Sequence, residues 1–268
     1  MFDFDIEPAR RYGAFASYES AASPASIEYF GENPATEMDR LLISYTTPAS
    51  YVLDIGCGAG HALCWLAPRV SHIWGIDANE ELLKTARLRA ERLAPANTTL
   101  IYGGCENPDV LQHIPEASIN VAFSRRGPRL NASLLRSLRK EAIFIQEIVS
   151  NLDGYPLGEI FGRRNYSLPS ASEQEVLLKA YTDLGFFPIS CKEYFYEEFF
   201  RDADHLAAFL SQIGVMLCPW LLPHALPDKP YDPANDQEAL ALYIRYNTTP
   251  RGVRLLRQRK ILVLRRVR

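Results

Sequence analysis

The sequence predicts an α/β fold in which a doubly wound, mostly parallel sheet of seven strands carries helices on both faces. Three observations support this prediction. Strand-like apolar runs alternate with amphipathic helical segments, and a glycine-rich turn joins the first such strand to the next helix. The chain of 268 residues, 47% of them hydrophobic, is also long enough to bury a complete core. We therefore expect one α/β domain with right-handed crossovers and an insertion.

The expected elements follow one another from residue 35 onward. A helix over 35–46 precedes the first strand. Asn79 is placed to cap one later helix, and Ser172 with Glu175 forms a capping box at the start of another. The predicted strands cover 50–55, 72–76, 98–102, 119–124, 141–148, 186–191 and 260–267, and the helices between them cover 61–67, 79–93 and 172–184.

Two segments lie outside this regular alternation, and both are candidates for covering a substrate. Residues 1–34 are expected to form an N-terminal arm on a domain of residues 35–268, either protecting the sheet edge or lining a pocket with Tyr12 and Tyr18. Residues 192–247 are expected to form a cap inserted before the last strand. Their aromatic run, Tyr194 to Phe200, favours packing under the inserted helices over an aromatic cage for a ligand.

Composition excludes few partners but favours an intracellular protein. The net charge of −3 and the pI near 6.0 give no overall attraction to nucleic acid or to an anionic membrane. Five cysteines without a C-x-x-C pair predict reduced thiols, and five histidines share no metal-ligand spacing, so no metal is expected. Without a signal peptide or a membrane-spanning run, a cytoplasmic location is expected, and the oligomeric state stays open.

The most informative stretch is V-L-D-I-G-C-G-A-G at residues 52–60. Glycines at alternate positions allow positive φ and let a ligand approach the backbone at a helix N-terminus. Asp54 would repel a pyrophosphate but suits an ammonium group. A dinucleotide site of the form G-x-G-x-x-G would need glycine where His61 stands. The loop therefore predicts an amino-acid-like cofactor, held by Asp54 and by Gly56, Gly58 and Gly60.

This loop and its acidic partners resemble those of the class I S-adenosylmethionine-dependent methyltransferases, a Rossmann-like family with type 11 and type 25 members. The resemblance covers residues 36–190 and the last strand. It implies that S-adenosylmethionine is the cofactor and S-adenosylhomocysteine the product. It also implies that the glycine loop, with Cys57, packs against the methionine portion, while Asp54 lies near the amino group.

The resemblance further assigns the nucleoside half of the cofactor. Asp77, about 20 residues after the loop, corresponds to the carboxylate that accepts hydrogen bonds from both ribose hydroxyls. Ala78 corresponds to a position beside the adenine ring. The family often has an aspartate after the third strand, whereas this chain offers Gly104, Cys105 and Glu106. Backbone contacts from Gly104 and Cys105 are expected there instead, and helix capping is the alternative for Glu106.

The acceptor side is less specific. The strand at 119–124 ends in Ser124-Arg125-Arg126, which points to the meeting place of donor and acceptor. Ser124 is a candidate cofactor contact. Arg125 and Arg126 are candidates for holding a carboxylate or phosphate of the acceptor, with solvated loop cations as the alternative. Glu147 is a candidate proton acceptor, although alignment alone can supply much of the catalysis.

The expected function is transfer of a methyl group to an O or N atom of a small-molecule acceptor. A ribosomal or transfer RNA methyltransferase is one alternative, faintly supported by the region from Asp202 to Trp220. Nine Arg or Lys residues within 245–268, without an acid, could contact RNA phosphates, but protection of an edge strand is the favoured interpretation. A non-catalytic S-adenosylmethionine-binding protein is the second alternative.

Overall fold

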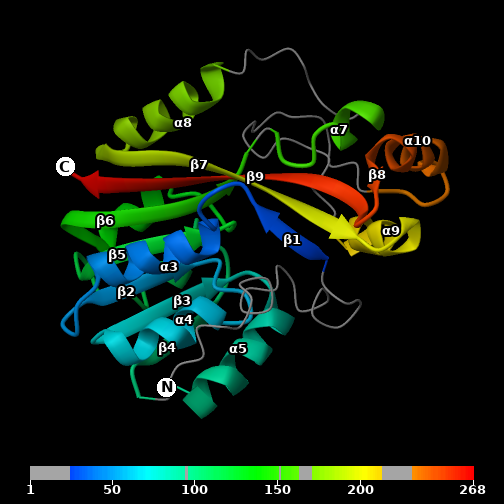
Figure 1. Cartoon of the computed structure of the whole chain (residues 1–268). Coiled ribbons are helices and arrows are strands. Elements are labelled where there is room, and N and C mark those ends of the chain that lie inside the picture. The colour runs from blue at the N-terminus through cyan, green and yellow to red at the C-terminus, as the bar shows by residue number, and fades with distance from the viewer. Residues whose placement is uncertain (1–24, 94–95, 151, 163–170, 213–230) are drawn as a thin grey trace.

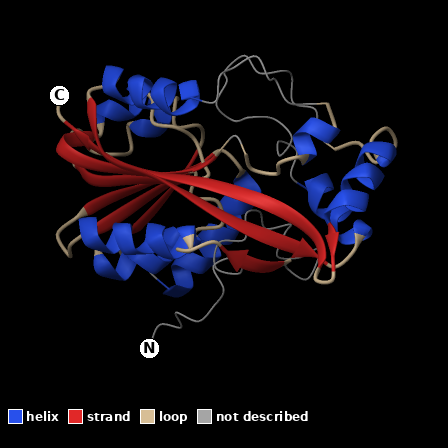
Figure 2. Cartoon of the chain, turned by 45° about the horizontal axis from the view of Figure 1, so that its top comes forward, coloured by secondary structure: helices blue, strands red, loops and turns tan. Residues whose placement is uncertain are grey.

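A computed structural model describes residues 25–93, 96–150, 152–162, 171–212 and 231–268. In this part of the chain, nine strands form one sheet with the order β1-β7-β9-β6-β5-β2-β3-β4, and β8 pairs with β9. Helices cover both faces of the sheet (Figures 1 and 2). The predicted doubly wound α/β class is therefore confirmed, with two short strands added to the seven expected.

Five neighbouring strands run parallel and correspond to the first five of the seven predicted strands. Their long apolar runs reflect burial on both faces. Val52 and Ile73 pack toward α3, α4 and α5, whereas Leu53 and Trp74 belong to the core on the opposite face, beside α8. The parallel strands are β2 (Tyr51–Ile55), β3 (His72–Asp77), β4 (Thr98–Tyr102), β5 (Ile119–Arg125) and β6 (Leu138–Val149).

The helices begin largely where the sequence signals place them. The Asn79 side chain accepts a hydrogen bond from Leu82 N at 3.1 Å, which confirms the predicted cap of α5. The side chain of Ser172 lies outside the described residues. The helices are α3 (Pro34–Tyr45), α4 (His61–Leu66), α5 (Glu80–Leu93), α6 (Pro108–Leu111), α7 (Leu157–Ile160), α8 (Ala171–Asp183), α9 (Ala203–Gln212) and α10 (Gln237–Asn247), with 3₁₀ turns η1 (Ala67–Arg69) and η2 (Ala132–Arg136).

The last two long strands differ from the prediction. β7 (Phe186–Phe200) continues past Cys191, and β9 (Gly252–Arg266) begins well before Lys260. The two strands pair antiparallel along almost their whole length and form a ribbon that runs beyond the parallel strands (Figure 1). Residues 192–200 are therefore part of the sheet. The prediction failed because buried charged residues interrupt the apolar alternation that marks a strand.

The far end of this ribbon carries a third, smaller core. Phe200 and Leu255 from the strands pack with Leu206 and Phe209 of α9 and with Tyr243 of α10. The Phe200 and Phe209 rings lie 4.9 Å apart. This arrangement confirms that the end of the aromatic run packs under the inserted helices. The neighbouring short strands are β1 (Ser26–Tyr29), which pairs with β7, and β8 (Thr248–Thr249).

The basic C-terminal strand is not an edge strand. β9 lies between β6 and β7, so its cations cannot protect an edge, and that interpretation was wrong. Instead Arg257, Arg259 and Lys260 are buried and form ion pairs with acids from other elements. Among the helices that the structure describes, none is both long and apolar enough to cross a membrane.

Candidate active site

The loop after β2 is fixed to two neighbouring strands at the carboxyl edge of the sheet. The N–H groups of Gly56 and Cys57 both donate to Ile76 O in β3, at 2.8 and 3.0 Å. Gly56 has φ +75°, and a Cβ there would lie 2.6 Å from Cδ of Pro128. Only glycine fits this conformation and this close approach. The loop after β2 is therefore packed directly on the loop after β5.

The tip of the same loop is open on one side. Gly58 has φ +53°, and a Cβ added there would approach only Leu82 Cδ1, at 4.0 Å. Its N–H donates to Asp77 Oδ2 at 2.7 Å, and Arg89 of α5 donates to Ala59 O at 2.6 Å. Gly60, with φ +75°, begins α4. Asp77 and Arg89 thus fix the backbone of the loop, while the space beside Gly58 stays open to a ligand.

Asp54, the last-but-one residue of β2, is a buried acid whose charge the protein does not neutralise. Its side chain is 2% exposed, and Oδ2 has no hydrogen-bond partner among the described residues. Burial raises the pKa of Asp54 well above its ordinary value, the nearby Asp77 carboxylate adds to this increase, and Arg125 opposes it. A cationic group bound beside Asp54 would supply the missing compensation.

Asp77 closes β3 and faces the glycine loop. Its Oδ2 accepts from Gly58 N, and its Oδ1 accepts from Asn79 N at 2.8 Å. A carboxylate offers about four acceptor positions, so these two bonds leave capacity for two hydroxyl donors. Turn formation before α5 and ligand binding are therefore compatible at this residue. Ala78 follows immediately and is exposed.

The turn after β4 lies beside Asp77. Gly103 N donates to Asp77 O at 2.9 Å, which fixes the two strand ends together. A Cβ on Gly104 would collide with the Glu106 carboxylate, which folds over it. Cys105 is buried, and its Sγ accepts from Asn131 Nδ2 at 3.4 Å. Cys105 is therefore packed toward Asn131 and can meet a ligand only through its backbone, whereas the Glu106 side chain of the same turn is exposed.

Two other predicted cofactor contacts are side chains buried beneath the edge. Ser124 near the end of β5 is fully buried, and its Oγ has no partner in the part of the chain that the structure describes. A Cβ on Gly127 would lie 3.0 Å from that Oγ. The Cys57 thiol points into the core near Gly75, and burial raises its pKa well above the ordinary value. Cys57 can therefore contact a ligand only through its backbone.

Arg125 does not extend into an acceptor space. Its Nη1 donates to Asp39 at 2.9 Å, its Nη2 to Ala35 O at 3.0 Å, and its Nε to Glu147 at 3.3 Å. The side chain is 7% exposed. All three of its nitrogens are thus engaged with α3 and β6. This arrangement argues against the predicted contact with an acceptor and gives Arg125 the role of joining three elements.

Glu147 at the end of β6 is surrounded by cations. Burial tends to raise its pKa, but the attraction of Arg126, Arg125 and Arg259 outweighs that effect, so the pKa lies below the ordinary value. The distances from Glu147 Oε1 to Nε of Arg259 and Arg126 are 3.6 and 3.8 Å. A carboxylate stabilised in this way is a weak base. The predicted role as proton acceptor does not fit these surroundings.

Arg126 remains the predicted substrate residue whose position suits contact with an acceptor. It has φ +57°, which is uncommon for a residue with a side chain, and its N–H donates to Glu147 O at 3.0 Å. Its side chain is 25% exposed, more than three times that of Arg125. Tyr12 and Tyr18 lie outside the described residues.

Buried charge continues from Glu147 into the β7–β9 ribbon. Asp153 Oδ1 accepts from Arg257 Nε at 3.0 Å, Arg259 Nη1 at 2.5 Å and Gln258 N at 2.8 Å. Arg257 also donates to Glu198 at 2.5 Å. We call this set, Glu147, Asp153, Glu198, Arg257 and Arg259, the ribbon ion cluster. Each of its acids has at least one arginine partner.

Sequence reasoning missed several residues that shape this edge. Asp39 anchors Arg125, Arg89 holds the glycine loop, and Asn131 fixes the turn after β4. Gln146 accepts from the Tyr181 hydroxyl and donates to Pro128 O at 3.3 Å. Each of these contacts joins distant parts of the chain, so no local pattern marks them. For Asn131, its position before η2 was an available signal.

Comparison with known proteins defines the class. Residues 52–140 match the family model described as a methyltransferase domain. The chain is 28% identical over 133 residues, 48% of its length and 57% of the relative's, to protein-L-isoaspartate O-methyltransferase from Saccharophagus degradans. It is 32% identical over 96 residues, 35% and 49% of the two lengths, to a probable cobalt-precorrin-6B C(15)-methyltransferase from Methanothermobacter thermautotrophicus. The chain thus spans about half of these relatives.

A solved structure gives the same fold. A putative methyltransferase from Bacillus halodurans superposes with a TM-score of 0.59 at 16% identity, covering 87% of this chain and all of the other. The family match contains the whole glycine loop and Asp77. Residues 52–140 are therefore similar to a methyltransferase domain, and the sheet around them has the class I methyltransferase fold.

Proposed function

We propose that this chain binds S-adenosylmethionine across the carboxyl ends of β2, β3 and β4 and transfers its methyl group to a small-molecule acceptor. The observation that carries the proposal is Asp54, a buried carboxyl whose Oδ2 has no hydrogen-bond partner among the described residues, four residues before Gly58 with its open side. An amino-acid cation would compensate this acid. Two further acceptor positions on Asp77 suit a ribose diol.

The residues would divide the work as follows. Asp54 attracts the ammonium group, and the backbone from Gly56 to Gly60 lies along the methionine portion. Asp77 holds the ribose hydroxyls, while Ala78 and the Gly104 backbone border the adenine. Ser124 Oγ, buried below the centre of the edge, is available to the cofactor or to an ordered water.

The bound cofactor would supply an electrophilic methyl group on a sulfonium. Held by Asp54, the Gly56–Gly60 backbone and Asp77, it would make this methyl group available to an O or N atom of the acceptor, whose proton would pass to solvent. The protein's share is alignment, which can contribute much of the rate without a dedicated base. The low pKa of Glu147 agrees with this division.

Arg126 is the group that we assign to the acceptor. It directly follows β5, beside the proposed methyl position, and its guanidinium is partly exposed. A guanidinium favours a carboxylate or phosphate on the acceptor. The RNA alternative loses support because Arg257, Arg259 and Lys260 of the basic stretch are buried in ion pairs.

The proposal is tested by calorimetric titration of S-adenosylhomocysteine into the wild type, Asp77→Asn and the control Asp109→Asn. Asp109 is an exposed acid at the start of α6, near the same edge. Loss of the charged acceptor at Asp77 should weaken binding roughly tenfold to a hundredfold, since a hydrogen bond to a charged group contributes about 1.5–3 kcal/mol. The control should bind as the wild type does.

Equal affinity of the wild type and Asp77→Asn would refute the ribose assignment. A second assay separates an enzyme from a non-catalytic binder: S-adenosylhomocysteine formation is followed in the presence of fractionated small metabolites and, separately, of RNA. Product that depends on the metabolite fraction supports the proposal. Product that depends on RNA, or binding without any product in either fraction, contradicts it.

A further inference from the structure

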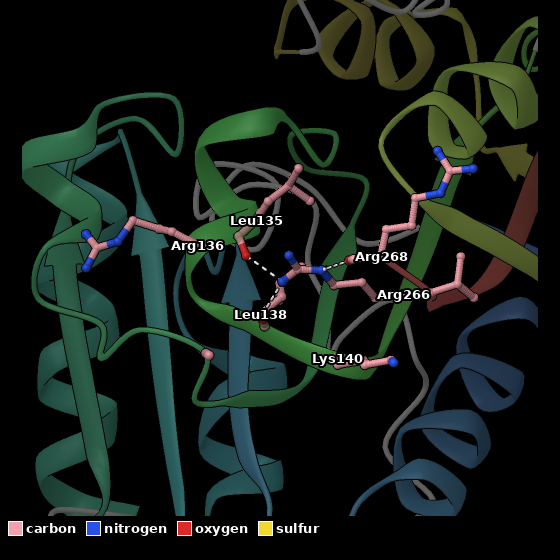
Figure 3. Close-up of a pocket in the computed structure, with 8 residues that line it drawn as sticks. Leu135, Arg136, Leu138, Lys140, Arg266 and Arg268 are labelled. Atoms are coloured by element: carbon pink, nitrogen blue, oxygen red, sulfur yellow. Dashed lines mark hydrogen bonds between the residues drawn. The ribbon is translucent and has the colours of Figure 1, made fainter.

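A second ligand-sized space lies at the opposite edge of the sheet, away from the glycine loop. It is bounded by η2, by the beginning of β6 and by the end of β9 (Figure 3). Because β6 is parallel to β2 and begins here, this is the amino edge of the parallel strands. The cavity volume is about 310 Å³. This volume is at the lower end of the range for small-molecule pockets.

The lining of this cavity is basic and partly apolar. Its charged members are Arg136, Lys140, Arg266 and Arg268, and no acid is among the described residues that line it. Leu135, which is partly exposed, and Val267, which is exposed, provide apolar surface. Arg136 forms an ion pair with Glu116 at 3.5 Å and extends away from the other three cations (Figure 3). Three cations thus surround the cavity of a chain whose overall net charge is −3.

Arg266 is held in a fixed orientation at the centre of the lining. Its Nε donates to the main-chain oxygen of Arg268 at 2.6 Å, and its Nη1 donates to Leu135 O at 2.6 Å and to Leu138 O. Its Nη2 donates no hydrogen bond to the residues that the structure describes. A guanidinium already immobilised by carbonyls loses little rotamer entropy when it binds an anion.

The other two cations lie at the rim on exposed side chains. Lys140 and Arg268 are both exposed, and each can reorient toward a bound group. The Ala117 side of the cavity is fixed to η2, because Ala117 N donates a hydrogen bond to Arg136 O at 2.8 Å. The cavity therefore combines one fixed donor, two mobile cations and an apolar surface.

We propose that this cavity binds a phosphate monoester whose organic part is small and apolar or aromatic. A phosphate offers several acceptor oxygens and about two negative charges, which match three cations better than a carboxylate does. The apolar side chains accommodate the organic part. The site is separate from the proposed cofactor site, which lies at the carboxyl edge of the same sheet.

The test compares inorganic phosphate, phenyl phosphate and phenol by calorimetry at low ionic strength, with S-adenosylhomocysteine present at saturation. The matched variants are Lys140→Gln and Arg139→Gln. They are adjacent, exposed residues of β6 that lose the same charge, but only Lys140 lines the cavity. Phenyl phosphate should bind more tightly than inorganic phosphate, and phenol should not bind.

Lys140→Gln should weaken phenyl phosphate binding by about twofold to fivefold, the range of an exposed charge pair, and Arg139→Gln should leave it unchanged. Equal weakening in both variants would indicate a diffuse charge effect and overturn the proposal. It would also be overturned if the wild type bound neither phosphate, or if phenyl phosphate bound no more tightly than the inorganic ion. The proposal would likewise be overturned if a single-stranded RNA bound far more tightly than phenyl phosphate and if Lys140→Gln and Arg139→Gln weakened RNA binding equally.

Discussion

Two groups of buried acids lie near the carboxyl edge of one sheet, and their electrostatics are opposite. Asp54 has no hydrogen bond to Oδ2 within the described residues, and burial raises its pKa. Glu147 and Asp153 are as deeply buried, yet arginines overcome the effect of burial and lower both pKa values. Burial is similar in the two groups, so the difference comes from the partners.

This difference separates structure from ligand binding. Each acid of the ribbon ion cluster already has an arginine partner, and the cluster joins β6, β7 and β9. Asp54 has a raised pKa instead, and under the proposed function the ammonium group of the cofactor would favour its charged form. An uncompensated buried acid is therefore the better marker of a binding site than a large cluster of buried charges.

The largest expected effect is on stability in the compensated group. Asp153→Asn removes the charge that Arg257 and Arg259 share, and breaking a buried pair in this way should lower the free energy of unfolding by about 3–5 kcal/mol. The control is Asp183→Asn, which removes an exposed pair with Lys179. That change should cost about 0–1 kcal/mol. Urea denaturation monitored by circular dichroism measures both.

If the two variants lost equal stability, the ribbon ion cluster would not be the structural element described above. The affinity of the Asp153→Asn variant for S-adenosylhomocysteine provides a second measurement. Asp153→Asn, measured under conditions where it stays folded, should bind S-adenosylhomocysteine within about twofold of the wild type, because Asp153 contacts only cluster members and backbone.

A smaller effect distinguishes the open face of the glycine loop from an ordinary open turn. Gly58→Ala and Gly162→Ala both place a Cβ at positive φ, +53° and +62°, with no close neighbour. Each should cost about 1 kcal/mol of stability through backbone strain. Only Gly58→Ala should also weaken S-adenosylhomocysteine binding, because its Cβ would enter the space assigned to the cofactor. Calorimetric affinities that fall equally, or in neither variant, contradict that assignment.

The last prediction concerns how the free energy of unfolding depends on pH. The contribution of Asp54 should have the opposite sign to that of Glu147 and Asp153. A lowered pKa, as at Glu147 and Asp153, gives stability that is present above the unfolded-state value and is lost as the pH falls. The raised pKa of Asp54 gives stability that is present at low pH and is lost as the pH rises through the folded-state value. Asp54→Asn should therefore become more stable relative to the wild type as the pH increases. Urea unfolding at several pH values measures this trend. A difference in unfolding free energy between Asp54→Asn and the wild type that stays constant with pH would contradict a raised pKa at Asp54.

The fold and the conformation of the glycine loop could be predicted from the sequence because their signals are local. Alternating elements specify the sheet, and Gly56 occupies a position that requires positive φ beside Pro128. Asp54 and Asp77 are identified by their distance from that loop. The glycines and Asp54 lie within one short stretch, and Asp77 follows about 20 residues later at the end of the next strand.

The acceptor side and the ribbon could not be predicted because their contacts are remote in sequence. The sequence predicts Glu147 as a proton acceptor, but Arg125 and Arg259 form ion pairs with it. These partners are distant in sequence, so no local pattern indicates the pairs. Likewise, Arg257 and Lys260 suggested an exposed basic stripe, although both are buried by strands on either side. Charge in a sequence does not state whether its partner is water, another residue or a ligand.

The most direct test of Asp54 as the ammonium-binding group is its loss of a proton when the cofactor binds. S-adenosylhomocysteine is titrated into the wild type and Asp54→Asn in buffers of different ionisation enthalpy, between about pH 5 and pH 8. The wild type should release a proton where Asp54 is protonated in the free protein, because the bound ammonium favours the carboxylate. Asp54→Asn should bind more weakly and lack this release. Wild-type affinity and unchanged proton release in Asp54→Asn would contradict the account.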